Sequence, residues 1–159
     1  MLKAIFLEMW AYLKVILLSS IVFFTILVAF DFNIISQFII KSARDWLRLF
    51  GIFLASSFGF YWNYFKQNDS EFGEWLHWKG ASKIYSRGFI YPIFVYIINI
   101  VLLVILSEYK KVALAKITFW CMIYGFITLI SLLSTIYNFM KLLNLFRTIH
   151  KSESANQVS

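Results

Sequence analysis

The side chains that could carry out chemistry are few in this sequence, and their spacing does not bring them together. His77 and His150 lie far apart, and neither has a second ligand at the spacing of a helical metal site such as H-E-x-x-H. Glu71 and Glu74 would share one face of a helix, but they stand in a polar stretch where water would solvate both. Cys121 is the single cysteine, so the chain cannot form an intrachain disulfide or a thiolate metal framework. The pattern predicts a protein that is not an enzyme and that holds no metal and no cofactor.

The composition points to lipid as the solvent of this chain. Of the 159 residues, 61% are hydrophobic and only 14% are charged, whereas soluble domains usually carry about 25% charged residues. The 15 lysines and arginines contribute to a net charge of +7, but they lie in small groups at the ends of apolar blocks, where they would meet lipid phosphates. We therefore expect the lipid bilayer as a partner and no direct binding of nucleic acid.

Four apolar blocks divide the chain, and each is long enough, or nearly so, to cross a hydrocarbon core of about 30 Å. We predict an all-α integral membrane protein of one membrane domain, residues 1–159. It has about four transmembrane helices arranged as two hairpins, together with short interfacial amphipathic helices. The predicted spans are approximately 9–30, 49–65, 89–106 and 117–140. The second span is the shortest, and if it only dips into the membrane the number of spans becomes three. Residues 152–159 are polar and are expected to be a disordered tail.

The central polar segment, residues 66–88, separates the two hairpins. Within it Phe72 and Trp75 share one face, which predicts a short amphipathic helix lying on the membrane. A side chain of the Asn68–Asp69 pair is expected to cap this helix, and Gly80 to end it. Large aromatic side chains favour the boundary between membrane and water. The predicted interfacial anchors are Trp10, Trp62, Phe72, Trp75, Trp78 and Trp120.

Small and polar residues within the spans indicate where helices pack against one another. Gly51, Ala55 and Gly59 follow at i, i+4 and i+8 and form one stripe of the second span, which lets another helix backbone approach closely. Asn99 is the strongly polar residue in the middle of the third span, and its amide is expected to hydrogen-bond to a neighbouring helix. Gly125 adds a small position in the fourth span. These five residues are the predicted helix-packing positions.

The distribution of basic residues indicates an orientation. With four spans, the two termini and the central segment lie on one side of the membrane, and that side holds nine of the 15 lysines and arginines. The more basic side is usually cytoplasmic. We expect a multi-pass protein of a bacterial inner membrane with both termini in the cytoplasm.

In length, span number, basic connections and a composition rich in Phe, Ile, Lys, Asn and Tyr, the whole chain resembles the small inner-membrane entry exclusion proteins of F-like conjugative plasmids. The resemblance implies a protein of the recipient cell that blocks conjugative DNA entry from donors carrying a related plasmid, by recognising a donor mating-pair component. The chain is also similar, more loosely, to immunity proteins against pore-forming colicins, which implies lateral contact with the membrane helices of a toxin. Neither resemblance assigns a role to an individual residue.

Other functions stay open on the sequence alone. A holin-like pore former would also be a short chain with several spans, although holins tend to have fewer spans and a strongly charged tail. A small accessory subunit of a membrane complex is not distinguished by sequence from an exclusion or immunity factor. A second copy of the chain is a further candidate partner, which would make the protein a homo-oligomer.

Overall fold

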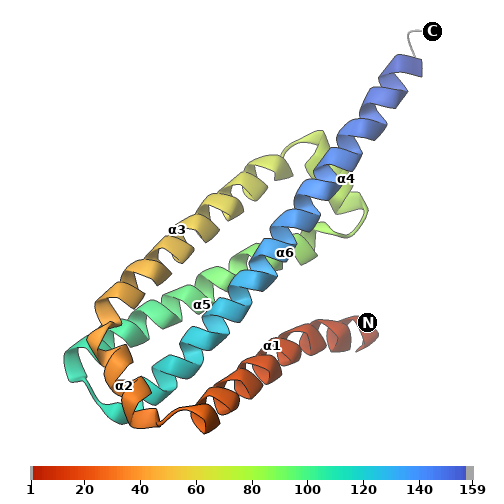
Figure 1. Cartoon of the computed structure of the whole chain (residues 1–159). Helices are drawn as coiled ribbons and strands as arrows, with labels where there is room; N and C mark the ends of the chain where they lie inside the picture. The colour runs from red at the N-terminus through yellow and green to blue at the C-terminus, as the bar shows by residue number, and fades with distance from the viewer. Residues whose placement is uncertain (1, 157–159) are drawn as a thin grey trace.

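The structure is a computed structural model that describes the backbone of residues 2–156 and the side chains of residues 13–149. All of its regular elements within this range are helices. They are α1 (Leu2–Ala29), α2 (Phe32–Lys41), α3 (Ala43–Asn68), α4 (Glu71–Trp78), α5 (Ser82–Tyr109) and α6 (Val112–Asn156). The four long helices α1, α3, α5 and α6 run between the same two ends of the molecule (Figure 1). The short helix α2 and the α5–α6 turn lie at one end, and α4 lies at the other with the start of α1 and the end of α6.

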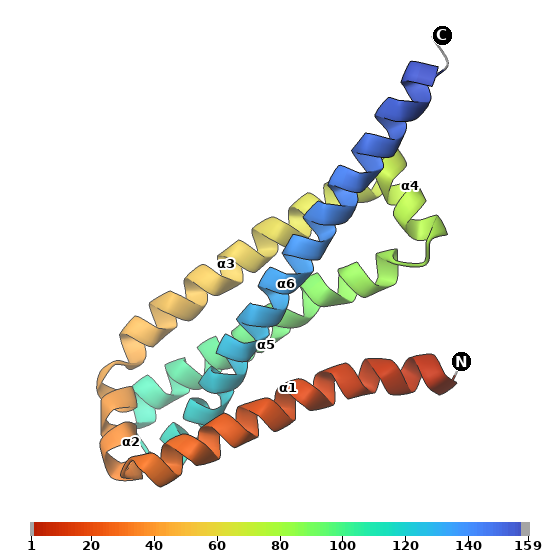
Figure 2. The same ribbon diagram turned by 45° about the vertical axis from the view of Figure 1, so that its right-hand side comes forward.

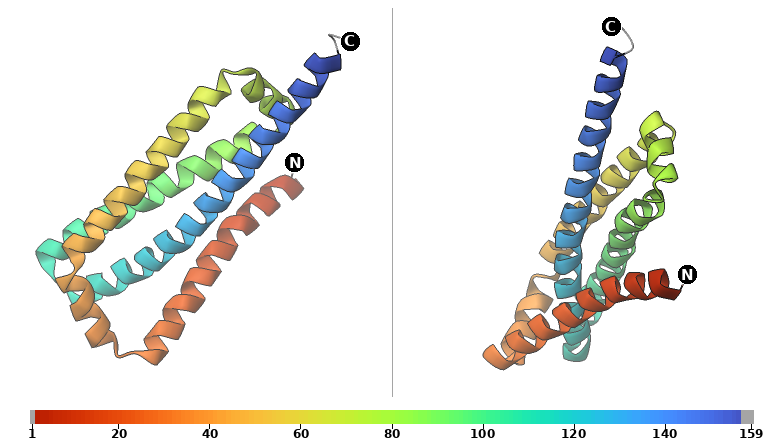
Figure 3. Two further views of the ribbon diagram at one scale, coloured as in Figure 1. Left: turned by 45° about the horizontal axis from the view of Figure 1, so that its top comes forward. Right: turned by 90° about the vertical axis from the view of Figure 1, so that its right-hand side faces the viewer.

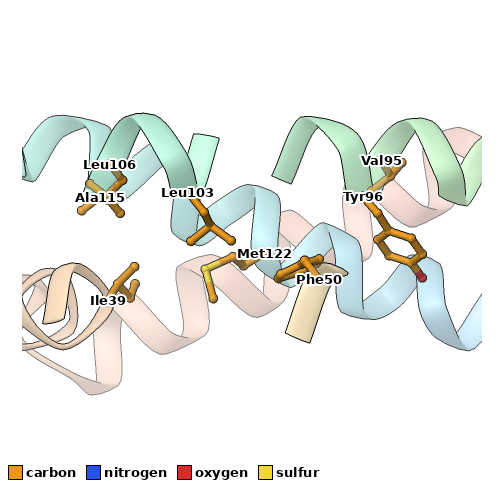
Figure 4. Packing of buried hydrophobic residues seen from close by; sticks show 8 residues of the cluster. All are labelled: Ile39, Phe50, Val95, Tyr96, Leu103, Leu106, Ala115 and Met122. Atoms are coloured by element: carbon orange, nitrogen blue, oxygen red, sulfur yellow. The ribbon is translucent and has the colours of Figure 1, made fainter. Parts of the chain in front are cut away.

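Helix α5 occupies the centre of the bundle and packs against both α3 and α6. Phe50 of α3 and Tyr96 of α5 are fully buried, with ring centroids 6.1 Å apart. Because lipid is as apolar as these side chains, close packing rather than exclusion of water holds such helices together. The buried cluster at this level consists of Ile39, Phe50, Val95, Tyr96, Leu103, Leu106, Ala115 and Met122 (Figure 4).

Helix α1 lies against the first part of α6 and diverges from the bundle toward its own start (Figure 2). Its buried Phe23 places its ring 5.7 Å from the ring of Phe119 on α6. Asp31 then caps α2, accepting a hydrogen bond of 2.9 Å from the backbone N–H of Asn33. The chain bends by 111° between α1 and α2, so α2 crosses the end of the bundle (Figure 3).

The central segment forms the predicted short helix, α4, but its cap differs from the prediction. Ser70 caps α4, accepting a hydrogen bond of 3.4 Å from the N–H of Gly73. The predicted cap in the Asn68–Asp69 pair is wrong because α3 continues through Asn68 and uses these residues for its own end. The prediction that Gly80 ends the helix is confirmed, since Gly80 follows α4 with a φ of +70°, which suits glycine.

Two helices among the described residues are long and apolar enough to cross a membrane, namely α5 and the part of α6 from Val112 to Ile149. A third span results if the bent pair Leu13–Ala29 and Phe32–Lys41 is counted as one. Helix α3 does not qualify, because serines, glycines, tyrosines and Asn63 interrupt its apolar run. The prediction of a helical protein with membrane spans is confirmed for two or three spans, and the fourth span stays a prediction.

The long helices extend beyond the predicted apolar blocks. The predicted spans 89–106 and 117–140 lie inside α5 and α6: α5 starts seven residues earlier and ends three residues later, and α6 starts five residues earlier and continues to Asn156. Residues 152–156, which were expected to be disordered, form the last part of α6, while residues 157–159 lie outside the described range. The helix can continue this far because no glycine or proline follows Gly125.

Candidate interaction surfaces

The predicted stripe of small residues lies on the outside of the molecule. Ala55 and Gly59 are exposed and Gly51 is partly exposed, and a Cβ atom added at either glycine would meet nothing within 4 Å. Helix α3 turns its opposite face to the bundle, where Phe50 and Ser57 are fully buried. The chain therefore places none of its described helices against the stripe.

Large apolar side chains surround this stripe. In helical projection Ile52 and Phe58 stand on either side of it, and Trp62 lies about one turn beyond it. All three are exposed, at 61%, 49% and 57%. Small residues between bulky ones are an arrangement against which another membrane helix packs closely. We call this surface the α3 outer face and define it by Gly51, Ala55, Gly59, Ile52, Phe58 and Trp62.

Glycines inside the bundle have the opposite environment. Gly125 is buried, and a Cβ atom there would lie 2.6 Å from Cε1 of Phe50 and 3.1 Å from Nδ2 of Asn99. A Cβ atom at Gly88 would lie 2.9 Å from Cγ2 of Thr135. At these two positions α5, α6 and a side chain of α3 approach one another so closely that any larger residue would force a shift.

The amide of Asn99 is buried but does not bond to another helix. Its Nδ2 donates to the carbonyl of Val95, 2.9 Å away on the same helix, and its Oδ1 has no hydrogen-bond partner among the described residues. The predicted interhelical hydrogen bond is therefore wrong, because the neighbours across the interface are Gly125 and the ring of Phe50. The hydroxyl of Tyr96, one turn earlier, is likewise buried without a partner in the described part of the chain.

The predicted membrane anchor Phe72 lies inside the protein. It is 3% exposed, and its ring centroid lies 5.6 Å from that of Phe139 and 5.4 Å from that of Phe146, both on α6. The prediction that it faces the membrane boundary is wrong, because the apolar face of α4 packs on α6. The hydroxyl of Tyr64 on α3 also donates a hydrogen bond of 2.8 Å to the carbonyl of Ser82 at the start of α5. The buried cluster at this end consists of Tyr64, Phe72, Leu76, Phe89, Leu132, Phe139 and Leu143.

The other predicted anchors differ in exposure. Trp62 and Trp78 are largely exposed and are available to the membrane boundary. Trp75 and Trp120 are half-buried, each with another aromatic ring of α6 beside it. The side chain of Trp10 lies outside the described residues.

The side chains considered for chemistry do not converge on one site. Glu71, Glu74 and His77 are exposed on α4, and Cys121 is partly buried in α6. The side chain of His150 lies outside the described residues. Among the described side chains, no three from His, Cys, Asp and Glu gather closely enough to hold a metal ion. The features with a defined geometry are helix surfaces.

Sequence reasoning missed three residues that shape the bundle. Gly88 was not singled out, although a glycine near the start of one span and small hydroxyl residues such as Thr135 in the next are a usable signal. The burial of Tyr96 carries no signal, because tyrosine also suits the membrane boundary. Lys110 ends α5 with a φ of 48°. Glycine or asparagine is the usual residue in this left-handed conformation, so a lysine gives no sequence signal for it.

No protein-family model, curated protein or solved structure matches this chain. Its class follows from the fold alone. It is an all-α protein with two helices able to cross a membrane, or three if the bent pair of α1 and α2 forms one span.

Proposed function

We propose that this chain is a non-enzymatic protein of a bacterial inner membrane that blocks conjugative DNA entry from donors carrying a related plasmid, by binding a mating-pair protein. The observation that supports a binding role is the α3 outer face. Its three small residues are covered by no described helix of the chain, although such stripes are where membrane helices meet. An uncovered stripe suits a helix from another protein.

This lateral role requires α3 to lie in the membrane. We propose that α1, α3, α5 and α6 each span it, as two hairpins, with α4 and both termini on the cytoplasmic side. Helix α3 has 26 residues, which at 1.5 Å per residue is about 39 Å, longer than a hydrocarbon core of about 30 Å. Arg48 and Lys66 stand at the two ends of its apolar stretch, where their charges would reach the headgroups.

The same face favours a second candidate function, that of an immunity protein against a pore-forming colicin. In that case the α3 outer face would contact the membrane-inserted helices of the toxin, and its side chains would set the specificity. The two candidates share the kind of contact and differ in the partner. A second copy of the chain would be a third candidate partner for this face, and cross-linking would detect it as a dimer.

Expression of the chain in a recipient strain tests both candidates. Exclusion predicts fewer transconjugants from donors carrying a related plasmid, and immunity predicts survival when pore-forming toxins are added. Unchanged transfer from every related donor would remove exclusion, and unchanged killing by every toxin would remove immunity. Lysis on expression would instead identify a holin-like pore former.

A single substitution tests the α3 outer face itself. Because a Cβ atom at Gly59 meets nothing within 4 Å, Gly59→Leu should leave the bundle intact while filling the stripe, and activity should fall to that of a recipient without the protein. Ser56→Leu is the matched control, since Ser56 is exposed on the same helix but off the stripe. Immunoblots should show equal amounts of both variants in the membrane. Full activity of Gly59→Leu would contradict the assigned face.

A further inference from the structure

A cavity of about 440 Å³ lies at the end of the bundle where α2 meets α3 and α5 turns into α6. Its lining residues are Ile40, Lys41, Ala43, Arg44, Ser107 and Lys110. The three cations come from three different places in the chain, namely the last residue of α2, the second residue of α3 and the residue after α5. The break between α2 and α3 and the α5–α6 turn bring these places to the same end of the molecule (Figure 1).

The positive charge of this cavity is not balanced by the described residues. No acidic side chain lines it, and its three cations form no ion pair in the described part of the chain. Of the acids at this end, Asp31 caps α2. The Oδ1 atom of Asp45 lies 3.7 Å from a guanidinium nitrogen of Arg48, and both of these side chains are exposed. Glu108 is exposed and does not line the cavity. A concave site that carries three positive charges attracts an anion.

Three helix ends meet at the cavity. Ala43 and Arg44 begin α3, whereas the other lining residues stand at the ends of α2 and α5. The positive end of the α3 dipole is therefore accompanied by the negative ends of two other helices. The attraction for an anion thus comes from the three cationic side chains.

The position of the cavity along α5 indicates what kind of anion it meets. Helix α5 is long and apolar enough to cross a membrane, and its buried apolar positions end at Leu106, just before Ser107 and Lys110. The cavity thus lies at the polar end of a helix that can span a membrane, where lipid headgroups would meet it. Neighbouring turns expose apolar side chains, with Phe38 of α2 and Val104 of α5 at 59% and 46%. This combination suits a ligand that has both a phosphate and acyl chains.

We propose that this cavity binds the phosphate of an anionic phospholipid, for which phosphatidylglycerol is the probe. Lysine and arginine donate charge-assisted hydrogen bonds to phosphate oxygens, and basic pockets between membrane helices bind anionic headgroups. The bound headgroup holds the α2–α3 break against the α5–α6 turn. This site is separate from the α3 outer face, so it does not depend on the partner proposed above.

Native mass spectrometry of the purified full-length protein, titrated with phosphatidylglycerol or phosphatidylcholine, tests the site. The parent protein should bind phosphatidylglycerol more tightly than phosphatidylcholine. The pair Arg44→Gln and Lys110→Gly removes two of the three cations, and glycine suits the left-handed backbone at Lys110. At about 1 kcal/mol for each basic residue, the pair should weaken phosphatidylglycerol binding about 30-fold and leave phosphatidylcholine binding unchanged.

The matched control is the pair Arg48→Gln and Lys111→Gln. It removes the same charge from the same end of the molecule, but neither residue lines the cavity, so phosphatidylglycerol binding should change little. Equal weakening by both pairs would overturn the proposal, because it would assign the preference to the basic end as a whole. Absence of a preference in the parent would also overturn it. Displacement of phosphatidylglycerol by excess inorganic phosphate would assign the site to the free ion, whereas unchanged lipid binding supports the lipid.

Discussion

Replacing Gly125 with alanine tests whether close backbone contact holds the bundle together. The added methyl group would lie 2.6 Å from Cε1 of Phe50 and 3.1 Å from Nδ2 of Asn99. The Phe50 ring cannot move away easily, because it is fully buried and its centroid lies 5.6 Å and 5.7 Å from those of Phe53 and Phe126. Overpacking of a core lowers the free energy of unfolding by about 1–3 kcal/mol. Alanine in place of glycine raises it by about 1 kcal/mol, because alanine has the higher helix propensity. Because an approach of 2.6 Å is far inside van der Waals contact, the upper end of the overpacking range applies, and we expect a net loss of about 2 kcal/mol in the free energy of unfolding.

The assay is reversible unfolding of the purified protein in mild detergent, followed by tryptophan fluorescence. Gly59→Ala is the control, because a methyl group there meets nothing within 4 Å, and it should be neutral or stabilising by up to about 1 kcal/mol. Adding Phe50→Leu should recover part of the loss caused by Gly125→Ala, since it removes the ring that the methyl group meets, and the double-mutant cycle measures that coupling. A Gly125→Ala variant as stable as the parent would refute the reasoning.

Three further predictions concern single side chains. Phe72→Ala should lower the free energy of unfolding by about 3 kcal/mol or more, because it leaves a cavity in the aromatic cluster under α4, and limited proteolysis between α3 and α5 should become faster. Trp78→Ala is the control: its position is 84% exposed, so the cleavage rate should stay unchanged. Lys110→Gly should raise the free energy of unfolding by about 1 kcal/mol, because Lys110 holds a φ of 48°, and a lower unfolding temperature would contradict this. Asn99→Leu should not destabilise the protein in the same unfolding assay, because it removes a buried carbonyl oxygen without a described partner; a loss of about 2 kcal/mol or more would show that this oxygen is satisfied in the membrane.

Local signals predicted the helices well. The blocks 89–106 and 117–140 lie within α5 and α6, because a long apolar run in lipid has no stable alternative to a helix. The end of α4 just before Gly80 was also predictable, since a helix end depends on a few neighbouring residues. Extension of these helices into polar residues was less visible, because charged and polar side chains are tolerated in the turns that leave the membrane.

Contacts between helices were not predictable from spacing. The face that carries Phe72 was identified correctly, but spacing alone does not distinguish a membrane boundary from α6 as the surface that covers it. The stripe at Gly51 and Gly59 has the same ambiguity, and the structure leaves it uncovered by the described chain. The break at Ser42 has neither glycine nor proline to mark it, and its hydroxyl bonds to the preceding turn instead. The basic cavity beside this break was therefore visible only once the helices were placed.

Helix α6 follows the other five described helices in the chain, yet most of them pack on it: α1 through Phe23, α4 through Phe72, and α5 through Gly88 and Asn99. During synthesis, α1 and α4 are therefore made before the surface on which they pack exists. Helices α3 and α5 can pair earlier, since their shared contacts precede α6 in the chain. The contacts among the described helices are thus completed only when α6 arrives. A chain that stops before Val112 would leave the aromatic face of α4 without its partner and open to quality-control proteases.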